Sequence, residues 1–236
     1  MKKIMSLFLS AAMVLGLSGC GSMNNTTKMG LGGAGGGAAV GAIIGGLIGH
    51  GKGAAIGAAV GAAAGGTAGV LIGKKMDKQA KELAQINGAQ VDTITDQNNL
   101  TGIRVTFDSG ILFGFNKTNL SESAKKSLSE FATSLRNNPE TDVTILGYTD
   151  NVGTRAANEK VSTQRAANVK TYLNQSGVSS TRMQSKGMAW DNPVASNDTE
   201  AGRAKNRRVE IYITANETMV KQAADGTLPS DAKIIM

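Results

Sequence analysis

The sequence predicts an α+β fold for the second half of the 236-residue chain, with a mixed β-sheet and two main helices packed on one of its faces. Two observations predict this fold. Apolar and polar residues alternate in several short segments, and apolar residues recur at helical spacing in two longer ones. A third observation, glycine at every fourth position in the first half, predicts a helical hairpin that precedes the domain.

Residues 1–19 have the layout of a signal peptide for secretion. Two lysines precede an uncharged apolar stretch that is too short for a comfortable transmembrane helix. The stretch ends in Leu17-Ser18-Gly19-Cys20, which resembles the bacterial lipobox, a motif in which the Cys thiol accepts diacylglycerol. We therefore expect acylation of Cys20, with residues 20–29 as a short tether. The alternative is an ordinary signal peptide followed by a buried Cys.

Residues 30–73 contain 18 glycines, and eleven of them recur at a strict spacing of four from Gly33 to Gly73. Residues four apart lie on one helix face, where glycine lets another helix backbone approach closely. His50-Gly51-Lys52 divides the segment into two arms of about 20 residues, which is the length that crosses a bilayer. The pattern predicts membrane-associated or self-associating helices and resembles the glycine-zipper regions of bacterial envelope lipoproteins. The alternative is a flexible Gly/Ala linker, although a linker needs no period.

A basic helical spacer is expected over residues 74–89. Four lysines accompany Met76, Ala80 and Leu83, which lie along one helical face. The pattern is typical of a short solvated helix, and a juxtamembrane segment that meets anionic headgroups is the alternative. Asn87-Gly88 ends the helical pattern.

The globular domain is expected over residues 90–215. It begins with a hairpin, because apolar and polar residues alternate on both sides of Asn98-Asn99, and residues 111–115 are expected to form a further short strand. Ser121 is placed to cap a helix that stops before Pro139. The apolar residues of this helix are spaced four, three and four apart: Ala124, Leu128, Phe131 and Leu135.

The rest of the domain continues the alternation of strands and helices. The expected elements are a strand at 143–146, a helix from about 155 to 175 that ends at Gly177, and strands at 182–187 and 208–214. Residues 216–236 show no strong period, so we expect a C-terminal tail without regular structure.

Four ordered motifs in the domain resemble the OmpA-like peptidoglycan-binding domain. They are Gly147-Tyr148-Thr149-Asp150-Asn151-Val152-Gly153, Val161-Ser162-Thr163-Gln164-Arg165-Ala166, Gly177-Val178 and Gly202-Arg203-Ala204-Lys205-Asn206-Arg207-Arg208-Val209-Glu210. The resemblance covers residues 103–214, about half the chain. With the lipobox-like motif and the glycine zipper, it implies a lipoprotein anchored in the outer membrane, with its globular domain in the periplasm.

This resemblance implies that Asp150 and Arg165 bind the free end of meso-diaminopimelate in the peptidoglycan stem peptide. The ligand carries an ammonium and a carboxylate on one carbon, and these groups match a carboxylate and a guanidinium fork. Taken alone, Asp150 would be a turn former and Arg165 a solvated charge on a helix.

Further positions are implied by the same resemblance. Asn158 and Phe115 correspond to positions at the pocket, and Asn116 stands where the family usually has Asp. Arg207 and Arg208 correspond to paired arginines, one of which is expected to brace the site through ion pairs.

Composition disfavours several other functions. One Cys and one His cannot form a disulfide and leave little basis for a Cys/His zinc cluster or for Ser–His catalysis, so we expect no enzyme, metal or cofactor. The net charge of +7 fits attraction to anionic wall and lipid better than nucleic acid, since no aromatic residues interleave the basic ones.

The expected function is a non-catalytic tether. Acyl chains on Cys20 would hold outer-membrane lipid, and the domain would hold peptidoglycan. The alternative is a membrane-embedded oligomer built by Gly33–Gly73, with the globular domain as an accessory anchor.

Overall fold

The computed structural model describes residues 66–96, 98–114 and 117–229. The predicted signal peptide, the acylation at Cys20, the tether and most of the predicted helical hairpin lie outside these ranges. Phe115 and Asn116 also lie outside them.

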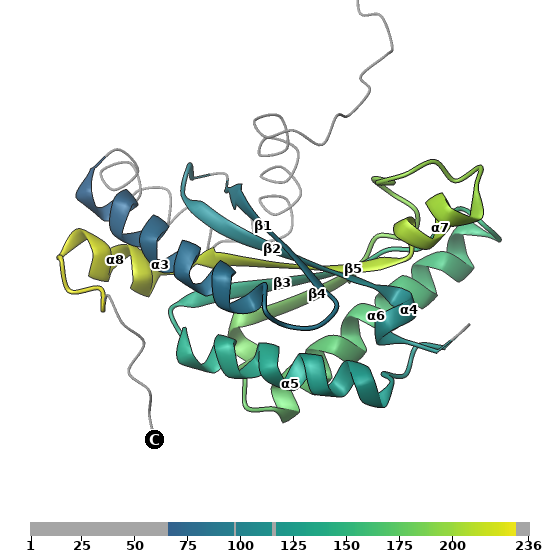
Figure 1. Ribbon diagram of the computed structural model, residues 1–236, viewed down its shortest axis with the longest axis horizontal. Helices are drawn as coiled ribbons and strands as arrows, with labels where there is room; N and C mark the ends of the chain where they lie inside the picture. The colour runs from purple at the N-terminus through teal and green to yellow at the C-terminus, as the bar shows by residue number, and fades with distance from the viewer. Residues whose placement is uncertain (1–65, 97, 115–116, 230–236) are drawn as a thin grey trace, which may run out of the picture. The chain divides into compact units, whose positions relative to one another are not determined.

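A five-stranded mixed sheet forms the centre of the described residues (Figure 1). Its spatial order is β1-β2-β5-β3-β4, with β3 and β4 parallel and the other neighbouring pairs antiparallel. The strands are β1 (Ala89–Thr95), β2 (Thr101–Asp108), β3 (Thr141–Gly147), β4 (Met183–Gly187) and β5 (Arg208–Ala215). The predicted hairpin is confirmed as β1 and β2. The last strand of the described residues, β5, occupies the centre of the sheet, and all of its residues are buried.

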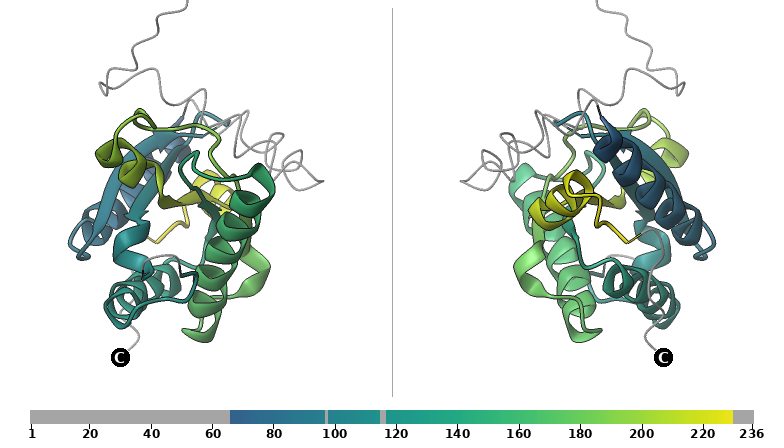
Figure 2. Two further views of the ribbon diagram at one scale, coloured as in Figure 1. Left: turned by 90° about the vertical axis from the view of Figure 1, so that its right-hand side faces the viewer. Right: turned by 90° about the vertical axis from the view of Figure 1, so that its left-hand side faces the viewer.

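The two main helices, α5 (Glu122–Asn137) and α6 (Arg155–Gln175), lie side by side on one face of the sheet (Figures 1 and 2). Ser121 caps α5 as predicted, because its Oγ accepts the Ala124 N–H at 3.1 Å. Thr154 caps α6 in the same way, and Gly177 follows that helix with a φ of +90°. The predicted α+β class is confirmed.

Close packing of α6 against the sheet depends on two glycines at strand ends. A Cβ on Gly147, the last residue of β3, would lie 2.3 Å from the Ser162 carbonyl oxygen. A Cβ on Gly187, the last residue of β4, would lie 2.3 Å from Thr163 Oγ1. The first half of α6 therefore lies directly against the ends of β3 and β4, and a larger residue at either position would force the two apart.

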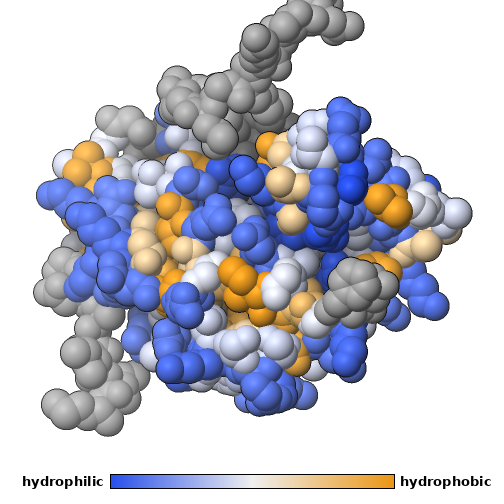
Figure 3. All heavy atoms as spheres, turned by 45° about the vertical axis from the view of Figure 1, so that its right-hand side comes forward, coloured by the Kyte–Doolittle hydropathy of each residue, from blue (hydrophilic) through white to orange (hydrophobic). Residues whose placement is uncertain are grey.

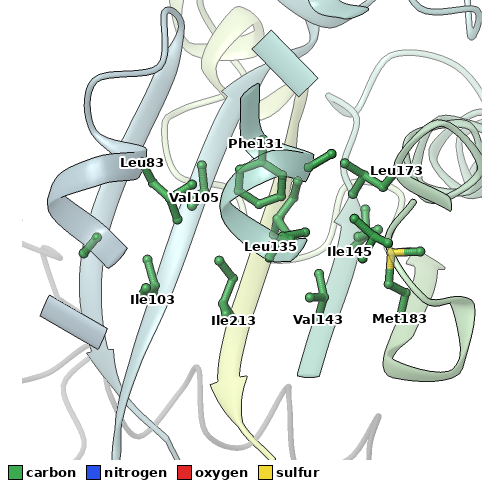
Figure 4. Close-up of a cluster of buried hydrophobic side chains, with 14 of the residues drawn as sticks. Leu83, Ile103, Val105, Phe131, Leu135, Val143, Ile145, Leu173, Met183 and Ile213 are labelled. Carbon is green, nitrogen blue, oxygen red and sulfur yellow. The ribbon is translucent and has the colours of Figure 1, made fainter. Parts of the chain in front are cut away.

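The main hydrophobic core fills the space between this face of the sheet and the helices (Figure 4). Inward residues of β2, β3 and β5, such as Val105, Ile145 and Ile213, meet Phe131 and Leu135 of α5. All five side chains are fully buried. Burial of this kind is the main favourable contribution to folding and holds the strand ends in place.

The helix expected as a solvated spacer is instead part of this core. It is α3 (Thr67–Leu83), which lies over β1 and β2 and begins within the predicted zipper. Ile72, Met76 and Leu83 are fully buried, so the apolar face predicted from sequence is confirmed while the solvated environment is not. Lys75 Nζ also pairs with Glu140 at 3.2 Å. The folded unit therefore starts well before residue 90.

The strand predicted for residues 111–115 is wrong. Ser109–Leu112 form a single helical turn, α4, and Phe113 makes an isolated bridge with Leu120. The turn buries Leu112 and Phe113 together, whereas a strand would direct these neighbours to opposite faces.

The tail prediction is wrong for its first part. Residues Glu217–Ala224 form α8, capped by Asn216, and α8 packs beside α3. Met219, Val220 and Ala223 are buried there.

Two further short elements were not predicted, α7 (Glu200–Asn206) and the 3-10 turn η1 (Ser180–Arg182). No helix in the described part of the chain is long and apolar enough to span a bilayer.

Candidate functional site

The loop after β3 presents Asp150 in a fixed position. Tyr148 N–H donates to the Arg208 carbonyl at 2.8 Å, and Thr149 N–H donates to the Ala189 carbonyl at 2.7 Å. Asp150 Oδ1 accepts the Val152 N–H at 3.1 Å, so the carboxylate orders its own turn. Only 8% of Asp150 is exposed. The carboxylate is thus held in place by the backbone around it.

Asn158 ties this loop to the first turns of α6. Its Nδ2 donates to the Val152 carbonyl at 2.8 Å and to the Thr154 carbonyl at 3.1 Å. The structure therefore places Asn158 against the loop that carries Asp150, as a support of the loop backbone.

Arg165 projects from the inner side of α6 and is 7% exposed. Its Nε and Nη2 donate to the Lys117 carbonyl at 3.2 and 3.1 Å, and its guanidinium lies 5.1 Å from the centre of the Phe113 ring. Within the described residues, Nη1 has no hydrogen-bond acceptor. Burial lowers the pKa of Arg165, as does the charge of Arg207, while Asp150 opposes both. These three charges therefore share one neighbourhood.

Arg207 joins Asp150 to α7. Its Nη1 donates to Asp150 Oδ2 at 2.6 Å and its Nη2 donates to Glu200 Oε1 at 2.7 Å. Glu200 Oε2 in turn accepts from Nε and Nη2 of Arg203, at 3.0 and 2.9 Å. We call Asp150, Arg207, Glu200 and Arg203 the relay. Sequence reasoning missed Glu200 and Arg203, although their spacing of three after the cap residue Thr199 is a usable signal.

Arg208 belongs to a separate cluster in spite of being the next residue. Its Nε donates to Glu210 Oε1 at 2.8 Å, and its guanidinium lies 3.8 Å from the centre of the Tyr148 ring. Tyr212 Oη donates to Glu210 Oε2 at 2.6 Å. We call Arg208, Glu210, Tyr212 and Tyr148 the buried cluster. Within the described residues, Arg208 makes no hydrogen bond or ion pair with Asp150 or Arg165.

The structure thus brings Asp150, Arg165, Asn158 and Arg207 together and separates Arg208 from them. The surface around the end of the domain that carries α7 is strongly hydrophilic (Figure 3). Across residues 66–96, 98–114 and 117–229, no group of His, Cys, Asp or Glu side chains is arranged to hold a metal ion. The arrangement suits a ligand with groups of both charges.

Two known families match separate parts of the chain. Residues 112–207 match the OmpA family, and residues 1–77 match the YMGG-like Gly-zipper family. The probable lipoprotein YiaD of Escherichia coli is 34% identical over 61% of this chain and 64% of its own length. The peptidoglycan-binding protein ArfA of Mycobacterium tuberculosis is 43% identical over 44% of this chain and 32% of its own length.

A solved structure shares the fold. A MotB-like protein from Desulfovibrio vulgaris superposes with a TM-score of 0.53 at 24% identity, over 62% of this chain and 94% of that structure. The chain spans between 36% and 64% of the length of the curated relatives that it matches first. The chain is therefore similar to the OmpA family over residues 112–207 and to the YMGG-like Gly-zipper family over residues 1–77.

Proposed function

We propose that this protein binds the peptidoglycan stem peptide through Asp150 and Arg165 and tethers the outer membrane to the cell wall without catalysis. The observation that carries the proposal is the buried, pre-ordered carboxylate of Asp150 in the same neighbourhood as the Arg165 guanidinium. The match of residues 112–207 to the OmpA family and the name of the relative ArfA support the choice of peptidoglycan.

The ligand chemistry follows from the two charges. The ammonium of meso-diaminopimelate would donate to Asp150, and the carboxylate on the same carbon would accept from Arg165. Because Nε and Nη2 of Arg165 already donate to the Lys117 carbonyl, we expect the carboxylate to bind first at Nη1. Arg165 would then hold ligand and loop together.

The tether requires a second attachment, which we assign to acyl chains on Cys20. Two or three chains hold a protein stably to a bilayer, whereas one chain holds it marginally. Outer-membrane attachment with a periplasmic domain agrees with the naming of relatives as outer-membrane proteins and a lipoprotein. No spacer separates the zipper from the domain, because α3 begins at Thr67 and packs into the core.

The experiment that tests this function is a sacculus pull-down with the full chain in detergent, competed by meso-diaminopimelate. Asp150→Asn and Arg165→Gln are expected to remove most of the bound protein. Asp225→Asn and Lys160→Gln, at exposed positions, are the matched controls and should bind as the wild type does. Undiminished binding by both site variants would contradict the proposal.

Self-association through Gly33–Gly73 remains a separate prediction. It requires the full chain to sediment as an oligomer in detergent. Replacement of the spaced glycines that precede α3, from Gly33 to Gly65, by leucine should convert it to a monomer. A wild-type monomer would contradict it and leave the peptidoglycan proposal standing.

A further inference from the structure

Arg207 divides its two terminal nitrogens between two carboxylates. Nη1 donates to Asp150 at 2.6 Å, and Nη2 donates to Glu200 at 2.7 Å. An arginine that faces a single carboxylate favours a two-point contact with both of its oxygens. Here Glu200 holds the second nitrogen, so Arg207 engages Asp150 at one oxygen only.

This division keeps the other oxygen of Asp150 available. Among the described residues, Oδ1 accepts only the Val152 N–H, and a carboxylate oxygen has room for a second donor. The charges also alternate along the relay, from Arg203 through Glu200 and Arg207 to Asp150. The charge of Glu200 therefore offsets the positive charge that Arg207 would otherwise impose on an arriving ammonium.

We propose that Glu200 is a positioning residue for the ligand's ammonium, acting through Arg207 to keep Asp150 Oδ1 free and negative. The inference rests on the proposed function, and it goes further by giving a residue outside the predicted site control over one end of the ligand. It also predicts selectivity. Loss of Glu200 should weaken ligands that carry an ammonium and spare those that carry carboxylates alone.

The local structure that positions Glu200 at the start of α7 supports this role. Thr199 Oγ1 accepts the Gly202 N–H at 3.1 Å and so caps α7, whose first residue is Glu200. A Cβ on Gly202 would lie 1.9 Å from the Ser196 carbonyl oxygen, so α7 packs tightly on the preceding loop. Asn206, at the other end of α7, donates to the Ala195 carbonyl at 2.8 Å. Hydrogen bonds from Arg207, and then from Arg203, lower the pKa of Glu200 and keep it ionised at neutral pH.

Glu122 offers a closely matched control. It is the first residue of α5, as Glu200 is of α7, and it pairs with Lys125 three residues later, as Glu200 pairs with Arg203. Neither Glu122 nor Lys125 contacts the relay in the described part of the chain. Glu122→Gln thus removes the same kind of helix-end charge without touching Arg207.

The test is a pair of NMR titrations of the full chain in detergent, one with meso-diaminopimelate and one with pimelate, which lacks both amino groups. Glu200→Gln is expected to weaken meso-diaminopimelate by roughly three- to tenfold, as for loss of one charge-assisted contact, and to leave pimelate unchanged or tighter. Glu122→Gln should leave both affinities at their wild-type values.

The outcomes separate the two proposals. If Glu200→Gln weakens both ligands equally, or matches Glu122→Gln, while Asp150→Asn loses meso-diaminopimelate, the positioning role is overturned and the proposed function stands. If the wild-type chain binds no meso-diaminopimelate, both proposals fall together.

Discussion

Arg207 and Arg208 are adjacent in the chain and belong to two different charge networks. Arg207 lies in the relay, where its side chain is 33% exposed and the side chains of its partners Asp150 and Glu200 are 12% and 67% exposed. Arg208 lies in the buried cluster, where its side chain and that of Glu210 are 3% and 5% exposed. The boundary between two elements produces this difference, because Arg207 is the C-cap residue of α7 and Arg208 is the first residue of β5.

The difference shows how one short motif can serve both ligand binding and stability. Charges that keep contact with water can exchange a partner for a ligand at little cost, and salt weakens them. Charges removed from water must stay paired, because breaking the pair leaves an uncompensated buried ion. We therefore expect variants of the buried cluster to change stability and variants of the relay to change binding.

Glu210→Gln should have the largest effect on stability. It leaves the Arg208 charge buried without its ionised partner and removes the carboxylate that accepts from Tyr212. A loss of about 3 kcal/mol in the free energy of unfolding is expected. Urea denaturation followed by circular dichroism measures it, with the exposed Glu217→Gln in α8 as the control. A loss no larger than that of the control would mean that the buried cluster contributes no more to stability than an exposed ion pair does.

Arg207→Gln should have the opposite pattern, with a small effect on stability and a large effect on ligand affinity. The Arg207 side chain is one-third exposed and glutamine can still donate a hydrogen bond to Asp150, so we expect a loss of unfolding free energy below about 1 kcal/mol. Asp150 loses the ion pair that positions its carboxylate, so affinity for meso-diaminopimelate should fall roughly tenfold, which is about 1.4 kcal/mol. Isothermal titration calorimetry and urea denaturation of the same sample give both numbers. A large fall in stability with unchanged affinity would reverse the assignment.

Arg203→Gln should have the smallest effect, because Arg203 stands at the far end of the relay from Asp150. Its pair with Glu200 is exposed to solvent, and Glu200 keeps its contact with Arg207. The denaturation midpoint should stay within experimental error, and affinity should change less than twofold. An effect on affinity as large as that of Arg207→Gln would show that the relay acts as one unit.

The sequence could predict most elements of the fold, because local signals define them. Alternation gave the hairpin, and caps with regular apolar spacing gave α5 and α6. The burial of α3 and the existence of α8 could not be predicted in this way. The apolar faces of α3 and α8 are buried because the two helices pack on each other, and the sequence does not show that contact. In addition, α8 has only eight residues, which is too short for a clear helical period.

The sequence could likewise predict some residues of the candidate site but not the contacts between distant ones. Asp150 and Arg165 follow from short motifs, and the structure places their charges in one neighbourhood. The link from Asp150 to Arg207 joins residues 57 positions apart, and it depends on β5 lying between β2 and β3. No local pattern specifies that order. The different environments of Arg207 and Arg208 became evident only once the strand was placed.

The most direct test of the central claim is calorimetric titration of the full chain in detergent with meso-diaminopimelate, comparing wild type with Asp150→Asn. We predict measurable binding by the wild type and at least a roughly tenfold loss in the variant, because the ammonium loses its ionised acceptor. The variant should keep a denaturation midpoint near that of the wild type, which shows that the fold is intact. Equal affinity in the two proteins would contradict the assignment of Asp150 as the ligand's partner.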